Sequence, residues 1–128
     1  MRKALPILFL SLAVNLTVLA QETDLNGTTI HYKYSSGSEV RANFLDDLYH
    51  FHWTSGPYKG IKGSVSYELI ELSNKKYAIN FFVEAHNSYV TLLFDFRKNK
   101  VVGSAIINNN GDILQSIEEA EITYKKFK

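Results

Sequence analysis

The chain has 128 residues, a formal net charge of +1 at pH 7 and no cysteine. The lack of cysteine excludes disulfides, thiolate metal sites and a thiol nucleophile, and the near-neutral charge gives no strong field that would attract nucleic acid or an anionic membrane. The aromatic content is more informative, because 8 tyrosines, 8 phenylalanines and one tryptophan fall mostly in alternating runs.

The first part of the chain has the layout of a cleavable export signal. The positive pair Arg2-Lys3 precedes an apolar run, Ala4–Val18, and Val18-Leu19-Ala20 offers the small or moderate side chains that a signal peptidase reads. The apolar run is shorter than the ~20 residues that span a bilayer, although an uncleaved anchor is the alternative. We therefore expect a signal peptide over residues 1–20, cleaved before Gln21.

The remaining residues, 21–128, are expected to form one domain that is secreted or periplasmic and is not an integral membrane protein. Runs rich in β-branched and aromatic residues alternate with turn signals, several of them with a period of two. The expected strands are Thr28–Tyr34, Ser38–Leu45, Leu48–Thr54, Ser64–Leu72, Lys76–Glu84, Ser88–Phe96, Lys100–Ile107 and Ile113–Phe127. About eight short strands with no helical period predict an all-β, antiparallel barrel or sandwich.

Some of these strands are apolar on both faces. In the run Lys76–Glu84, Tyr77, Ile79 and Phe81 share one face, while Phe82 lies on the other. A sheet with one wet face does not need this pattern. A barrel of about eight strands with a lined interior does, and it leaves room for one small ligand.

Three stretches carry a resemblance to a known family. They are Gly27–Gly37, then Phe51-His52-Trp53 with Gly56, Gly60, Gly63 and Tyr67, and then Tyr77–Glu84 with Val90–Phe96 and Val101–Gly103. Over Leu25–Ile107 this layout resembles the MoaF-like domains (molybdenum-cofactor-biosynthesis protein F) and is more distantly similar to the phenolic acid decarboxylases. The resemblance implies a lipocalin-like, calycin-type barrel with a ligand-sized interior.

The resemblance also implies roles for particular residues. In the decarboxylases two tyrosines on the first strand hold the substrate carboxylate, and an arginine and a glutamate flank the rest of the substrate. Tyr32 and Tyr34 match the tyrosine pair, and Glu84 matches the glutamate. Inside a barrel Glu84 would have a raised pKa suited to a general acid, whereas at a strand end beside His86 it would face water. The arginine has no counterpart, which argues against decarboxylation.

Other residues are candidates for ligand contact. His50 and His52 alternate with aromatic residues, but no spacing specifies the third ligand that a metal would need, so we expect no metal and no cofactor. Trp53 precedes the glycine-rich loop Ser55–Gly63 and either covers a ligand or plugs the barrel. The candidate ligand-binding residues are Tyr32, Tyr34, Trp53, Phe82, His50 and His52.

These patterns favour an exported barrel that binds a small, aromatic ligand. Two alternatives stay open: an enzyme performing acid–base chemistry on a small aromatic acid with Glu84 as proton donor, and a structural module with a filled interior. No nucleic acid partner is expected. The sequence leaves the oligomeric state open, a homodimer included.

Overall fold

A computed structural model describes residues 24–128, so the expected signal peptide lies outside the described residues. The described chain forms one antiparallel sheet in the order β4-β3-β2-β1-β9-β8-β7-β6-β5. The strands are β1 (Thr29–Tyr34), β2 (Glu39–Leu45), β3 (Leu48–Trp53), β4 (Lys62–Ser66), β5 (Glu68–Ser73), β6 (Lys76–Val83), β7 (Ser88–Asp95), β8 (Lys100–Asn109) and β9 (Asp112–Lys126), with a 3-10 turn, η1 (Glu84–His86), between β6 and β7.

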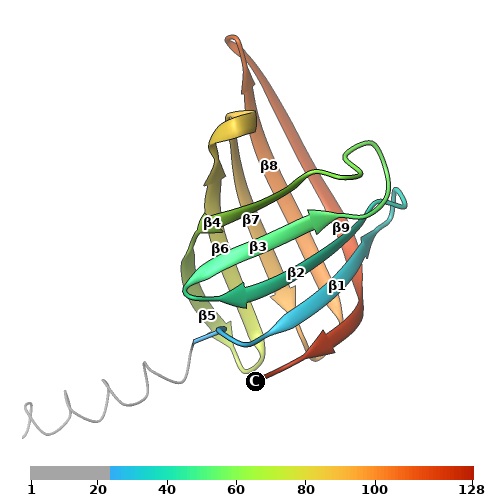
Figure 1. Ribbon diagram of the computed structural model, residues 1–128, viewed down its shortest axis with the longest axis vertical. Helices are drawn as coiled ribbons and strands as arrows, with labels where there is room; N and C mark the ends of the chain where they lie inside the picture. The colour runs from blue at the N-terminus through green and yellow to red at the C-terminus, as the bar shows by residue number, and fades with distance from the viewer. Residues whose placement is uncertain (1–23) are drawn as a thin grey trace, which may run out of the picture.

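The sheet curls into a nearly closed barrel, which confirms the predicted all-β barrel (Figure 1). It has nine strands rather than about eight, because the expected strand Ser64–Leu72 is divided at Tyr67 into β4 and β5. β4 pairs with β3, whereas β5 pairs with β6 at the other end of the sheet. This one bent run of chain therefore joins the two ends of the sheet.

Alternation along the strands places the core inside the barrel. β2 shows the pattern most clearly, since Val40, Ala42 and Phe44 are buried while the residues between them are exposed. Ile30, Tyr32 and their counterparts on the other strands complete the core. Burying one large apolar side chain stabilises the fold by about 1.5–3 kcal/mol, so this inward row is what holds a barrel without disulfides together.

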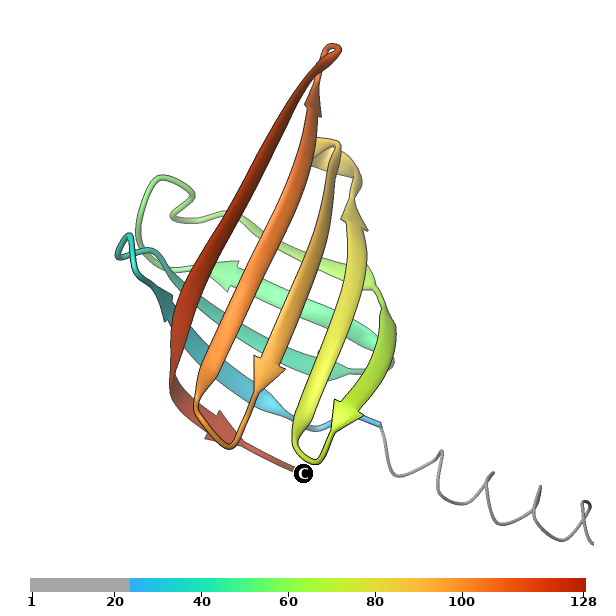
Figure 2. The same cartoon turned by 180° about the vertical axis from the view of Figure 1, so that it is seen from behind.

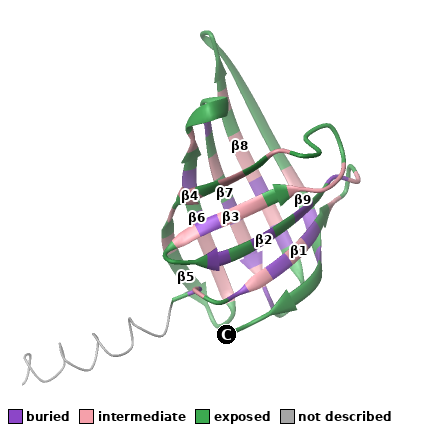
Figure 3. Ribbon diagram, viewed as in Figure 1, coloured by how far each residue is buried: buried purple, intermediate pink, exposed green. Residues whose placement is uncertain are grey.

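One end of the barrel is taller than the other. β8 and β9 run beyond β1–β3, so their hairpin projects past the rest of the wall (Figure 2). Buried positions gather in the body of the barrel, and the projecting tip is exposed (Figure 3). We call the end that carries this tip, η1 and the loop of residues 54–61 the hairpin end. No helix in the described part of the chain is long and apolar enough to cross a membrane.

Candidate functional site

Two tyrosine hydroxyls meet inside the barrel. Tyr32 on β1 and Tyr49 on β3 both point inward, and their Oη atoms lie 2.6 Å apart. The two side chains are only 3% and 1% exposed. Burial, the largest cause, raises the pKa of both phenols well above the ordinary value, so both stay neutral and share one hydrogen bond in an apolar interior.

Tyr34 continues this cluster toward the hairpin end. Burial raises its pKa to about 12, a hydrogen bond with Tyr32 acts in the opposite direction, and the charge of Glu118 raises it further. Its hydroxyl lies against Gly103 of β8, where an added Cβ would come within 2.7 Å of the tyrosine oxygen. A side chain at Gly103 would therefore push Tyr34 out of place.

An aromatic stack lies at the hairpin end. The Tyr34 ring is stacked on Trp53, with ring centroids 5.8 Å apart and planes 13° apart. Tyr58, from the loop of residues 54–61, contacts Trp53 edge-on, with ring centroids 5.2 Å apart. Tyr34 and Trp53 are only partly buried, so part of this stack is exposed at the hairpin end.

The loop that carries Tyr58 is held to the wall. Ser55 Oγ donates to the Gly37 carbonyl at 3.1 Å and accepts the Glu39 N–H at 3.0 Å. Gly56 has φ of +87°, and a Cβ there would approach Ser38 Oγ to 2.2 Å. This close approach requires glycine, so the loop is a docked rim beside Trp53.

The body of the barrel is filled by aromatic rings. The Tyr49 ring centroid lies 5.2 Å from that of Phe44 and 5.1 Å from that of Phe81. Phe44 also meets Phe94 edge-on at 6.0 Å. At the hairpin end, by contrast, Val83 and Val90 are only partly buried.

Glu84 does not lie in the barrel interior. β6 ends one residue earlier than the expected strand, at Val83, and Glu84 begins η1 as an exposed residue. The chain turns there because the Asn87 N–H bonds the Glu84 carbonyl at 3.1 Å and Asn87 adopts a left-handed φ of 47°. The buried proton donor that the enzyme hypothesis requires is therefore absent from this position.

A different carboxylate lies near Tyr34. Glu118 on β9 accepts hydrogen bonds from the Ser36 N–H at 2.7 Å and the Ser35 Oγ at 3.1 Å. Hydrogen bonding from Ser36 is the largest cause that lowers its pKa. Glu118 is not among the residues predicted from the sequence. It is in phase with the buried Ala120 and Ile122, and this alternation is the signal that could have found it.

The remaining candidates lie on the outside of the wall. Phe82 is 38% exposed, and its ring packs on Tyr89 with centroids 4.6 Å apart. His50 and His52 face outward because the aromatic residues that alternate with them face inward. The predicted ligand-binding set is therefore divided, with Tyr32, Tyr34 and Trp53 inside and the other three residues outside.

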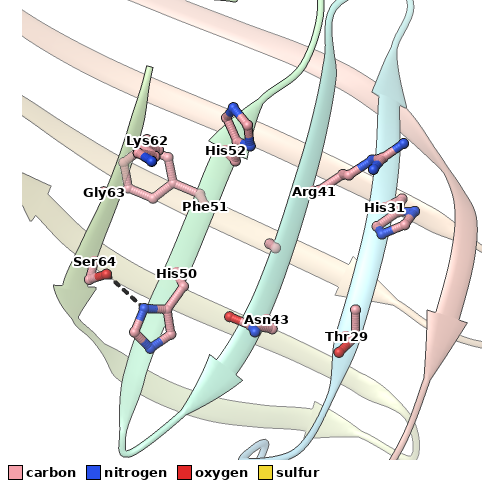
Figure 4. A pocket seen from close by; sticks show the side chains of 11 residues that line it. Thr29, His31, Arg41, Asn43, His50, Phe51, His52, Lys62, Gly63 and Ser64 are labelled. Atoms are coloured by element: carbon pink, nitrogen blue, oxygen red, sulfur yellow. Dashed lines mark hydrogen bonds between the residues drawn. The ribbon is translucent and has the colours of Figure 1, made fainter. Parts of the chain in front are cut away.

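The outward histidines line a shallow pocket of about 440 Å³ on the outer face of β1–β4 (Figure 4). His50 Nδ1 and Ser64 Oγ are 2.6 Å apart, and His50 Nε2 lies 3.2 Å from the Leu45 carbonyl. Because a carbonyl only accepts, Nε2 carries a proton, so a neutral ring accepts from Ser64 at Nδ1. Within residues 24–128, no group of three His, Asp or Glu side chains is placed to hold a metal ion.

A cysteine-free antiparallel barrel with an aromatic interior belongs to the small β-barrels. The particular family follows from comparison with known proteins. The family model described as "MoaF N-terminal domain" matches residues 10–107, and the chain belongs to that family. No curated protein matches the chain.

A solved structure shares the fold. It is the crystal structure of a "putative beta-lactamase" from Burkholderia vietnamiensis, which is 21% identical with a TM-score of 0.64. The likeness covers 77% of this chain and 92% of that chain. At this identity the likeness shows the fold alone, and the similarity to phenolic acid decarboxylases stays a prediction.

Proposed function

We propose that this protein is exported and binds a small aromatic ligand at the hairpin end of the barrel, beside Trp53 and Tyr34. The observation that carries the proposal is the half-buried Tyr34–Trp53 stack, with centroids 5.8 Å apart, above the buried tyrosine hydroxyls. Small-molecule sites combine apolar and aromatic lining with a few polar groups that orient the ligand. The hairpin end supplies both.

The neutral phenol of Tyr34 gives the site its polar group. With a pKa raised to about 12, Tyr34 keeps its proton at neutral pH. A protonated phenol can donate to a carboxylate or carbonyl oxygen of the ligand. The ring of Trp53, already parallel to Tyr34, offers a stacking surface for an aromatic group, and offset stacking contributes about 0.5–1.5 kcal/mol beyond the area buried.

Binding is better supported than catalysis. An acid–base reaction needs a proton donor or acceptor within reach of the ligand. Glu84 is exposed in η1, and the Glu118 carboxylate that lies near Tyr34 already accepts two hydrogen bonds from residues 35 and 36. A second candidate function is a structural module with a filled interior, and the aromatic packing in the body of the barrel favours it. A structural module would bind no ligand.

The proposal of export is supported by the sequence of residues 1–20, in which a basic start precedes a short apolar run and small residues. Intact-mass spectrometry of the protein purified from its native host tests it. A mature N-terminus at Gln21 supports export. An intact Met1 in the purified protein contradicts it.

The binding proposal is tested by titrating residues 21–128 with 4-hydroxybenzoate, cinnamate, phenol and indole while following the fluorescence of Trp53, the only tryptophan. We expect a saturable change with at least one probe, and weaker binding of that probe by Tyr34→Phe in calorimetry. Tyr89→Phe is the matched control, because it removes an exposed hydroxyl on the outer face. A flat response to all four probes supports the structural module instead.

A further inference from the structure

A row of basic side chains crosses the outer face of four strands. The strand register pairs His31 with Arg41, Arg41 with His52, and His52 with Lys62. Directly opposed side chains on one face lie about 4.5–5.5 Å apart at Cβ, and three strand spacings of about 4.8 Å give the row a length of about 14 Å. These four residues, which we call the basic row, are separated in sequence and meet only through the fold.

A second row beside it is polar and contains no lysine, arginine or carboxylate. Thr29, Asn43, His50 and Ser64 occupy the next paired positions across the same strands. His50 is held in place by its bonds to Ser64 and to the Leu45 carbonyl. The two rows together line the 440 Å³ pocket, a volume within the range of small-molecule sites.

The pocket has basic groups on both sides. In Figure 4, Arg41 and His31 lie on one side of it, and His52 and Lys62 lie on the other. The side chains that line it, all among the described residues, include no aspartate or glutamate. A ligand over β2 and β3 would therefore meet positive groups at both ends.

The basic row is not neutralised by the protein itself. Its arginine and its lysine, Arg41 and Lys62, lie on β2 and β4 with His52 between them. Glu39, the acidic residue next to Arg41 along β2, lies 3.9 Å from Lys33, and within residues 24–128 no carboxylate lies within ion-pair distance of Arg41 or Lys62. Burial and the charge of Arg41 lower the pKa of His31, and Glu39 offsets them only in part.

The row is also not a result of general basicity, because the chain has 14 lysines and arginines, 4 histidines and 13 acidic residues, and its formal net charge is +1 at pH 7. The basic row is therefore a local concentration of basic side chains on a chain whose charges nearly balance. An arginine presents a rigid fork of donors that matches phosphate and carboxylate oxygens. An anion placed between Arg41 and Lys62 would be attracted by both side chains.

We propose that the outer pocket binds a small ligand with two oxyanion groups, phosphate or carboxylate, one held by Arg41 and His31 and the other by Lys62 and His52. A single inorganic phosphate is too short to reach both ends of a row of about 14 Å. The site lies on the opposite side of the barrel wall from Trp53, so it is independent of the aromatic site proposed above.

Calorimetric titration of residues 21–128 with hexane-1,6-diyl bisphosphate and with octanedioate, at about 0.15 M salt, tests the proposal and separates phosphate from carboxylate. In both probes a chain of six methylene groups separates the two oxyanion groups. We expect saturable 1:1 binding of at least one of them. Arg41→Gln and Lys62→Gln should each weaken it about tenfold, in line with the loss of a charge-assisted contact. Lys100→Gln, which removes the same charge from an exposed position of β8, should change it less than about twofold, since that residue lies outside the pocket.

Three results would overturn the proposal. The first is no binding of either probe, and the second is an equal loss in the Lys100→Gln variant, which would indicate general charge attraction. The third is tighter binding of a short DNA duplex than of either small anion, which would assign the basic row to nucleic acid. Trp53→Leu should leave anion binding unchanged, so a failure of the aromatic site and a failure of the anion site can be distinguished.

Discussion

The hydrogen bond between Tyr32 and Tyr49 allows a sharp test of the interior. Tyr32→Phe and Tyr49→Phe each remove one oxygen and leave the ring in place, so neither substitution opens a cavity of ring size. The two hydroxyls lie 2.6 Å apart and are buried. The effect on stability therefore comes from the hydroxyl left behind, which has lost its partner in an apolar interior.

The two substitutions should lower the free energy of unfolding by different amounts. An unsatisfied buried polar group destabilises a protein by about 1–3 kcal/mol. Tyr32→Phe leaves Tyr49 without its partner, so we expect a loss of about 2 kcal/mol in the free energy of unfolding. Tyr49→Phe leaves Tyr32 with its second partner, Tyr34, so we expect about 1 kcal/mol.

The double variant should lose less than the sum of the two. Replacing both partners removes the orphaned group, so the expected coupling is about 1 kcal/mol or more, within the range measured for residues in contact. Urea unfolding followed by circular dichroism gives the three values, provided that the slope m is unchanged. Tyr89→Phe, with an exposed hydroxyl, should change stability by less than about 0.5 kcal/mol. If the loss in the double variant equals the sum of the two single losses within about 0.3 kcal/mol, the shared hydrogen bond is refuted.

Three further predictions concern pH and the rim. Burial raises the folded-state pKa of Tyr32 and Tyr49. Their contribution to stability is therefore complete below the unfolded tyrosine pKa of about 10 and is lost as the pH rises above it. Urea midpoints measured from pH 7 to 11 should fall only above about 10, and a flat profile would contradict the burial of these phenols. Hydrogen bonding from Ser36 lowers the pKa of Glu118, so Glu118→Gln should destabilise the protein at neutral pH by about 0.5–1 kcal/mol, after allowance for solvent. The stability difference between the wild type and this variant should shrink as the pH falls through the lowered pKa. A stability difference that persists in acid would rule out the charge as its cause. Gly56→Ala should lower the melting temperature more than Gly37→Ala. Both glycines have positive φ, but only Gly56 lies close to Ser38. Equal melting temperatures of the two variants would show that the loop is not docked.

The alternation of residues predicted most of the fold. Runs such as Ser38–Leu45 carry a strict period of two, and β2 keeps it residue by residue. The division at Tyr67 was not predictable in this way, because Val65, Tyr67 and Leu69 continue the inward alternation across the break. Only the change of pairing partner, from β3 to β6, reveals two strands.

The inner and outer faces were harder to assign. The spacing of Tyr32 and Tyr34 predicted that they share a face, and both do lie inside. For the strand with His50 and His52, alternation separates histidines from aromatic residues without saying which set is buried. The larger apolar area of the aromatic residues decides it, and this places both histidines outside.

Contacts between distant strands account for what the sequence did not predict. Glu84 was selected because it follows an aromatic strand, but the left-handed Asn87 turns the chain into η1 and leaves Glu84 exposed. Glu118 meets Ser36 only because β9 returns beside β1. The outer pocket likewise depends on the register of four strands.

A small aromatic ligand bound beside Trp53 at the hairpin end would change the surroundings of the indole ring. A chain with one tryptophan has one indole N–H resonance in a two-dimensional nitrogen–proton NMR spectrum. We expect 4-hydroxybenzoate, cinnamate, phenol or indole to shift this resonance in a saturable way, together with the backbone amides of Tyr34 and Val90, while the amide of Lys100 stays in place. An indole resonance that none of the four probes moves would contradict binding at this site.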